Sequence, residues 1–139
     1  MEQIYLSLLS GIFGSIFGAW ITLYIYKKNK KDEAINNMLY LVYSIGFQSH
    51  YSNNIGKLSL IFHEQYSELW AAYSALNKSI PRCKRKGTQK AWREFMCMKD
   101  LFNDSQPDYW DHFKKGTHTS KEQAVKCCSE FITYLEKLR

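Results

Sequence analysis

The sequence predicts an all-α protein, with one N-terminal transmembrane helix followed by a compact cytoplasmic helical bundle of four to five helices. Two observations predict this class. Residues 4–26 carry no charged side chain. Over most of the remaining chain, apolar residues recur at intervals of three and four, with no convincing strand-like alternation. We therefore expect a span at residues 4–26, a basic cytoplasmic flank at residues 27–31 and a ligand-binding helical domain at residues 32–139.

Bulk composition agrees with one modest soluble domain attached to a membrane segment. The 139 residues carry a net charge of +6, and include only 7 glycines and 2 prolines, while 16% of them are aromatic. This composition excludes collagen-like, disordered and disulfide-scaffold proteins. The chain after the span is also too short for two soluble domains of ordinary size.

The uncharged segment is long enough to cross a bilayer. At about 1.5 Å rise per residue, residues 4–26 extend roughly 35 Å, and a hydrocarbon core measures about 30 Å. A cleavable signal peptide starts with basic residues, whereas here Glu2 comes first and the lysines follow, so we expect a retained anchor. The positive-inside rule places the N-terminus outside the cell and the lysines that follow the segment in the cytoplasm. These lysines are Lys27, Lys28, Lys30 and Lys31. A buried helix of a soluble protein is the alternative.

Small residues of the span gather on one half of a helical wheel drawn at about 100° per residue. They are Ser7, Ser10, Gly11, Gly14, Ser15, Gly18, Ala19 and Thr22. Small faces let transmembrane helices pack closely, and hydroxyl groups can bond across the contact. We predict self-association through Ser7, Gly11, Gly14, Ser15 and Gly18. The alternative is that Gly and Ser are simply common in spans. A ring of these helices would also link assembly to permeability.

The first helix of the domain is expected to continue directly from the anchor. Its apolar stripe is Ile35, Met38, Leu39, Val42 and Ile45. Gly46 and residues 52–54 indicate where this long helix weakens. A second helix is predicted over residues 55–78, with a core stripe of Leu58, Ile61, Phe62, Leu69, Tyr73 and Leu76.

The second half of the domain is predicted from turn and capping residues. Pro81 and Gly87 bound a basic loop, and Thr88 is placed as the N-cap of a helix whose apolar face is Ala91, Phe95, Met98 and Phe102. A short helix is expected from Pro107 to Phe113, ending before Gly116. The last helix has two capping boxes, Thr119 with Glu122 and Ser120 with Gln123. Its predicted core face is Ala124, Cys128, Phe131, Leu135 and Leu138.

Positive charge is concentrated in one segment of the domain. Residues 78–99 hold eight basic residues and one acidic residue, and residues 100–111 hold four carboxylates and no basic residue. A basic loop with a glycine before a helix start is typical of phosphate sites. The candidate ligand contacts are Arg82, Lys84, Arg85, Lys86, Lys90 and Arg93, with Trp92 and Tyr109 as stacking faces for a base. Contact with anionic lipid headgroups, or an ordinary solvated or interface loop, are the alternatives.

The residue pattern favours a non-catalytic protein without a metal or cofactor. The cysteines lack paired C-x-x-C spacing and should stay reduced on the cytoplasmic side: Cys83, Cys97, Cys127 and Cys128. Asp108, Asp111 and His112 are close in sequence and are the weak candidate for acid–base chemistry. The chain contains no Walker loop, nucleophile elbow, zinc-protease or dinucleotide motif. A membrane-tethered enzyme is therefore the third and weakest reading.

The whole-chain arrangement resembles the small membrane effectors of type III CRISPR antiviral defence. The resemblance rests on the span GIFGSIFGAW with its KKNKK flank, the α-helical domain and the basic segment PRCKRKGTQKAWR. It implies a homotetramer in the bacterial inner membrane that binds cyclic tetra-adenylate, and not duplex nucleic acid, and then perturbs the membrane or opens a pore. The alternative is a non-signalling interaction protein, such as a superinfection-exclusion factor or accessory subunit, whose basic loop docks a protein or anionic lipid.

Overall fold

The computed structural model describes residues 2–51, 55–96 and 121–139, which are almost entirely α-helical. The helices are α1 (Glu2–Tyr51), α2 (Ile55–Glu64), α3 (Tyr66–Ser79), α4 (Arg82–Phe95) and α6 (Lys121–Leu138). Within these ranges there is no strand, so the predicted all-α fold is confirmed. The predicted helix at residues 107–113, the N-caps Thr119 and Ser120, and the predicted core residues Met98 and Phe102 lie outside the described residues.

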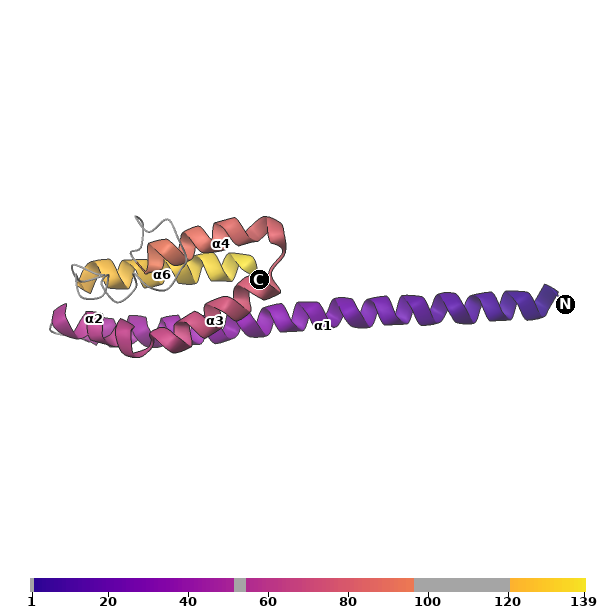
Figure 1. The fold of residues 1–139 in the computed structure, drawn as a ribbon, viewed down its shortest axis with the longest axis horizontal. Helices are drawn as coiled ribbons and strands as arrows, with labels where there is room; N and C mark the ends of the chain where they lie inside the picture. The colour runs from indigo at the N-terminus through magenta and orange to yellow at the C-terminus, as the bar shows by residue number, and fades with distance from the viewer. Residues whose placement is uncertain (1, 52–54, 97–120) are drawn as a thin grey trace.

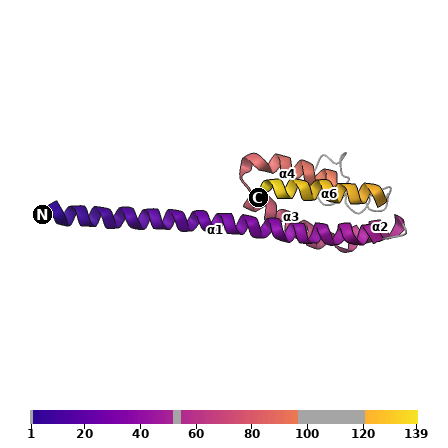
Figure 2. The same ribbon diagram turned by 180° about the vertical axis from the view of Figure 1, so that it is seen from behind.

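α1 joins the apolar segment to the helical domain without interruption. It has 50 residues, about 75 Å at ordinary helical rise. Its N-terminal half projects away from the other helices, while its C-terminal half packs against α3 and α6 (Figures 1 and 2). It is long and apolar enough to cross a membrane. The prediction that the apolar segment continues into the domain as one long helix is confirmed.

Gly46 does not weaken α1, contrary to the expectation. The helix continues through it to Tyr51. A Cβ atom at Gly46 would lie 3.4 Å from Cβ of Cys128, so the glycine allows α6 to approach closely. Burial raises the pKa of the Cys128 thiol to about 12, with the neighbouring Cys127 adding to the shift. The Cys128 thiol therefore stays protonated at neutral pH and is a packing group in this contact.

The helix predicted over residues 55–78 is two helices, with a break at Gln65. This residue has φ −93° and ψ 2°, and its backbone N–H donates to the carbonyl of Ile61 at 3.2 Å. No glycine or proline marks the break, which is why the sequence pattern missed it. Phe62 before the break and Leu69 after it are both fully buried. The described residues of the predicted apolar stripe therefore face the core on both sides of the break, while the side chain of Leu58 lies outside the described part of the chain.

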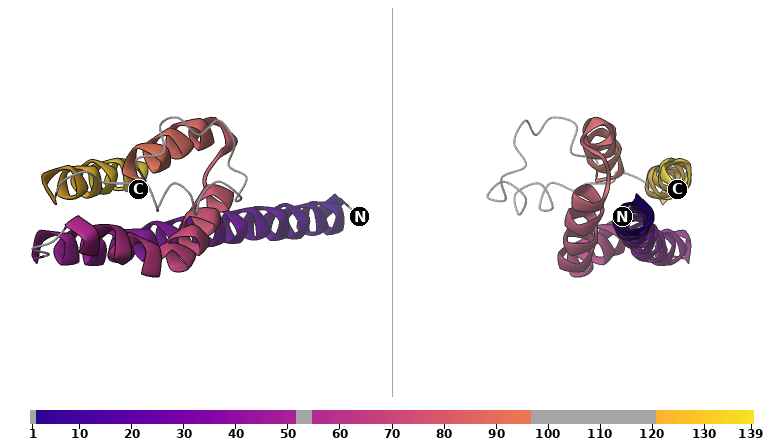
Figure 3. Two further views of the ribbon diagram at one scale, coloured as in Figure 1. Left: turned by 60° about the vertical axis from the view of Figure 1, so that its left-hand side comes forward. Right: turned by 90° about the vertical axis from the view of Figure 1, so that its right-hand side faces the viewer.

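The core is an apolar cluster closed by stacked aromatic rings. α3 and α6 pack on α1, and α4 packs on α6 (Figure 3). Ring centroids lie 4.5 Å apart between Tyr73 and Trp92, and 4.8 Å apart between Phe95 and Phe131. Trp92, expected as a stacking face for a base, is only 2% exposed and belongs to this core. The core faces predicted for α1 and α6 are buried as expected, with Leu39 half-buried.

Candidate functional site

The basic segment forms the first turns of a helix and is not a loop. Pro81 occupies the N-cap position of α4, and the backbone N–H of Lys84 donates to its carbonyl at 3.0 Å. Proline suits a helix start because its ring fixes φ and its missing N–H is not needed there. Arg and Lys are good helix formers, so the helix runs through Gly87. The loop predicted between Pro81 and Gly87 is therefore wrong.

Thr88 is not the predicted N-cap, because it lies in the middle of α4. Its side chain is buried, and its Oγ1 donates to the carbonyl of Lys84 at 3.2 Å and lies 3.0 Å from Oη of Tyr134. A Cβ atom at Gly87 would lie 3.1 Å from the same Oη. Gly87 and Thr88 thus belong to the contact between α4 and α6, and they do not form a phosphate cradle.

Replacing Gly87 with alanine should change the free energy of unfolding differently in two backgrounds. In Tyr134→Phe, where the crowding oxygen is gone, we expect Gly87→Ala to stabilise the protein by about 0.5–1 kcal/mol, because glycine is costly inside a helix. In the wild-type background the new methyl group meets Oη, and this gain should disappear. Urea unfolding of the detergent-solubilised chain, followed by circular dichroism, measures both values. Equal effects in both backgrounds would show that Gly87 and Tyr134 are not coupled.

Four of the six candidate ligand contacts share one face of α4. Arg82, Lys86, Lys90 and Arg93 fall within an arc of about 80° on the helical wheel, and we call these four residues the α4 basic stripe. Arg93 is half-buried, and the other three are exposed. Arg85 is half-buried beside the stripe, with a buried Nε that has no hydrogen-bond partner among the described residues. Lys84 is exposed on the opposite flank, so it does not share a surface with the stripe.

The α4 basic stripe begins at the end of the bundle from which the apolar half of α1 emerges (Figure 1). The C-terminal end of α6 lies at this same end, where Nζ of Lys31 donates to the carbonyls of Leu138 and Arg139 at 3.3 and 3.2 Å. α4 has 14 residues, about 21 Å of helix. The stripe therefore starts beside the predicted membrane flank and runs away from it.

The small face of the apolar segment is unobstructed. A Cβ atom at Gly11, Gly14 or Gly18 would meet nothing within 4 Å. The hydroxyls of Ser15 and Thr22 donate to backbone carbonyls of α1 at 2.9 and 2.8 Å. Since these donors are satisfied within the helix, they suit a hydrocarbon environment. The predicted self-association residues that are described thus form a surface another helix can approach.

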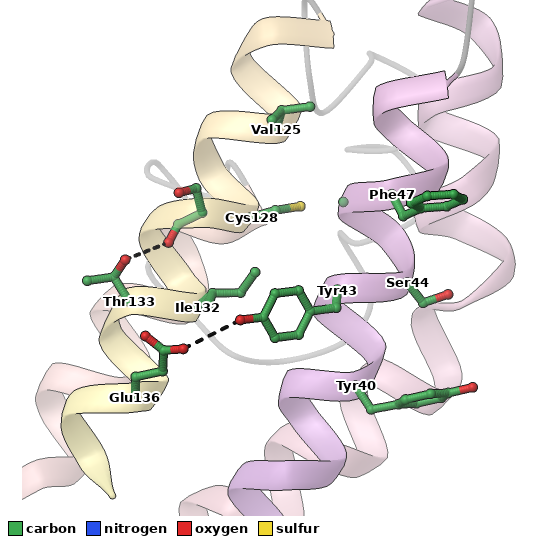
Figure 4. A pocket seen from close by; sticks show the side chains of 11 residues that line it. Tyr40, Tyr43, Ser44, Phe47, Val125, Cys128, Ile132, Thr133 and Glu136 are labelled. Carbon is green, nitrogen blue, oxygen red and sulfur yellow. Dashed lines mark hydrogen bonds between the residues drawn. The ribbon is translucent and has the colours of Figure 1, made fainter.

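A groove of about 780 Å³ between α1 and α6 was not predicted (Figure 4). Exposed Tyr40, Tyr43 and Phe47 line its α1 side, and Ile132 and Glu136 line its α6 side. Oη of Tyr43 donates to Oε1 of Glu136 at 3.4 Å. The three aromatic residues recur at intervals of three and four residues, on the face of α1 opposite its core stripe. This second apolar periodicity is the sequence signal from which the groove could have been predicted. At about 100° per residue they share a wheel half with the small face.

The described residues hold no group of three or more His, Cys, Asp and Glu side chains that could bind a metal ion. The weak acid–base candidates Asp108, Asp111 and His112, and also Cys97 and Tyr109, lie outside the described residues. Comparison with protein-family models, curated proteins and solved structures finds no match for this chain.

Proposed function

We propose that this chain is a non-catalytic, single-pass membrane effector whose assembly responds to an anionic ligand bound by its helical domain. The observation that carries the proposal is the continuity of α1, which contains both the membrane-compatible segment and a core stripe of the domain. A rearrangement of the domain therefore reaches the span without crossing a flexible linker. In this proposal residues 4–26 cross the bacterial inner membrane, and the lysine flank holds the domain in the cytoplasm.

The proposed assembly is a homo-oligomer of parallel α1 helices, with a tetramer as the expected form. Copies inserted in one membrane have the same orientation, so Gly11, Gly14 and Gly18 of neighbouring chains can meet along the small face. The aromatic groove residues Tyr40 and Phe47 lie on the same half of the wheel. A neighbouring α1 that packs along the small face would therefore also pass near this groove. Assembly of this kind would perturb the membrane or open a pore.

The proposed ligand is a cyclic oligoadenylate, with cyclic tetra-adenylate as the first to test. The α4 basic stripe supplies cations for phosphates, but it lies on the convex surface of one helix. A compact cyclic anion would therefore bind between stripes of symmetry-related subunits, each supplying the same contact. Ligand binding changes the assembly only if the ligand binds one assembly state more tightly than the other.

Cyclic tetra-adenylate is expected to raise the melting temperature of the detergent-solubilised full chain, and more so at low salt. A ligand at a hundredfold excess over its Kd stabilises a protein by about 2.7 kcal/mol. Lys86→Glu/Lys90→Glu on the stripe should remove the shift. The matched control Lys84→Glu/Lys137→Glu makes the same charge change at exposed positions off the stripe and should keep it. The ligand assignment is wrong if no ring size shifts the wild-type chain.

The second candidate is a docking protein of the exclusion-factor or accessory-subunit kind. The convex position of the α4 basic stripe favours it, since an extended acidic surface can contact all four stripe residues without an enclosed pocket. Poly-glutamate is a suitable probe of this chemistry. Binding of the probe to the wild-type chain but not to Lys86→Glu/Lys90→Glu, together with no response to cyclic oligoadenylates, would select the docking function.

A further inference from the structure

A cavity of about 700 Å³ lies between α1 and α3 at the end of the bundle nearest the apolar segment. Its α1 wall includes Tyr26, Lys27 and Lys30, and its α3 wall includes Ala75 and Lys78. Every residue of these walls is described, and none belongs to the α4 basic stripe. The cavity is therefore a second concentration of positive charge, and unlike the stripe it is concave.

The walls of this cavity combine cationic and apolar chemistry. Three lysines line it against one carboxylate, that of Glu33. Nζ of Lys30 lies 5.7 Å from the ring centroid of Tyr26, a cation–π distance that holds the ammonium group beside the aromatic ring. Alanines on both helices complete the walls, and on α3 these include Ala75. A ligand that suits this cavity has a negatively charged group and an apolar part.

The position of the cavity indicates where such a ligand comes from. Tyr26 is the last residue of the uncharged segment 4–26. Lys30 lies only about 6 Å further along α1, which is within the Debye length of about 8 Å at physiological salt. Tyrosine is also enriched at membrane interfaces. If residues 4–26 span the bilayer, the cavity lies at the level of the lipid headgroups.

We propose that this cavity binds the headgroup of an anionic phospholipid from the leaflet that faces the helical domain. The lysines bind the phosphate of a headgroup with net negative charge, and the alanine-lined wall receives the glycerol and upper acyl atoms. The bound lipid contacts α1 and α3 together, so it stabilises their packing next to the span. This inference rests on the membrane insertion proposed above, and it is independent of the ligand proposed for α4.

The flanking lysines have separate tasks in this arrangement. Lys27 and Lys30 line the cavity, whereas Nζ of Lys31 bonds the C-terminal carbonyls of α6. Lys28 is exposed and does not line the cavity. This division supplies a matched control, because Lys28 belongs to the same flank and carries the same charge.

The test uses the full chain reconstituted in nanodiscs of phosphatidylcholine with or without phosphatidylglycerol. Native mass spectrometry after mild detergent release detects lipid that stays bound. We expect phosphatidylglycerol to remain on the wild-type chain and to bind about thirtyfold more weakly to Lys30→Gln/Lys78→Gln, about 2 kcal/mol, since each lysine near a charged surface contributes about 1 kcal/mol. Lys28→Gln/Lys137→Gln, which removes two exposed lysines outside the cavity, should retain the lipid.

Two further measurements test whether the cavity itself holds the lipid. Ala75→Phe fills the cavity without changing charge and should also reduce retention, while circular dichroism verifies that each variant is folded. Soluble glycerol phosphate should not displace the lipid. The proposal is overturned if both lysine pairs lose lipid equally, if phosphatidylcholine is retained as well as phosphatidylglycerol, or if glycerol phosphate competes fully. Flotation of the chain with vesicles is scored separately, so failure of the membrane span is distinguished from failure of the cavity.

Discussion

Gly14→Leu/Gly18→Leu is expected to abolish the oligomers that we propose for the wild-type chain in membranes. Neither position has a neighbouring atom within 4 Å of an added Cβ, so a side chain at either position has room to leave the helix inside one chain. Between chains, two leucines on the small face would hold the helices apart and remove the close packing that drives association in lipid. Chemical crosslinking in native membranes should therefore shift from oligomer to monomer.

The matched control for this experiment places leucine on the opposite face of the same segment. Ile12→Leu/Ile16→Leu changes side chains that are already bulky and exposed, so the oligomers should be unchanged. If both double variants crosslink like the wild-type chain, the small face is not the contact surface. In that case the glycines reflect only the ordinary composition of spans, and the proposed assembly has to be carried by the helical domain.

Phe95→Ala is expected to produce the largest loss of stability among single substitutions in the helical domain. The ring is 1% exposed, and it lies 4.8 Å from Phe131, 5.7 Å from Phe62 and 5.8 Å from Trp92 between ring centroids. Truncating a buried phenylalanine to alanine costs about 3–5 kcal/mol, because it removes apolar burial and leaves a cavity. Urea unfolding of the detergent-solubilised chain measures this loss.

Phe47→Ala is the corresponding surface control. Its ring is 65% exposed on the groove side of α1, so its removal should change the unfolding free energy of the monomer by less than about 0.5 kcal/mol. A loss at Phe47 as large as that at Phe95 would mean that the groove is covered in the solubilised protein. A small loss of unfolding free energy for Phe95→Ala would contradict the inference that its ring is at the centre of the aromatic core.

The faces of the long helices could be predicted from sequence because burial repeats with the helical period. Ile35, Met38 and Val42 on α1, and Phe131 and Leu135 on α6, are buried where the pattern placed them. Each prediction needed only the residues of its own helix, since a stripe of apolar side chains specifies which side meets the core. The continuity of α1 likewise follows from the absence of a strong breaker before residue 51.

The start of α4 was mispredicted because a glycine can indicate either a loop or a close contact between two helices. Gly87 was interpreted as a loop residue, yet its actual constraint is the hydroxyl of Tyr134, which lies on α6 and more than forty residues later in the chain. Gly46 was misread in the same way, because its partner is Cys128. A contact between distant helices leaves no local pattern, so these two positions could be explained only once the packing was known.

For the candidate site, too, features within one segment could be predicted from the sequence, whereas contacts between distant segments could not. The clustering of basic residues was visible in the sequence, but the separation of Lys84 from the α4 basic stripe depends on where the helix begins. The cavity beside Tyr26 and the groove beside Tyr43 each join two helices that are distant in the chain. Surfaces of this kind exist only after folding. Sequence periodicity therefore indicates which residues one helix contributes to such a surface, but not which second helix completes it.

The packing of α6 against α1 sets the order in which this protein can mature. α1 is the first helix to be synthesised and α6 the last of the described helices, yet these two share the most extensive packing in the domain. The core side of α1, including Ile35 and Val42, therefore remains uncovered while the apolar segment is already available for insertion. If residues 4–26 insert as proposed, insertion comes before domain closure, and the chain is bound to a bilayer before its own interior is complete.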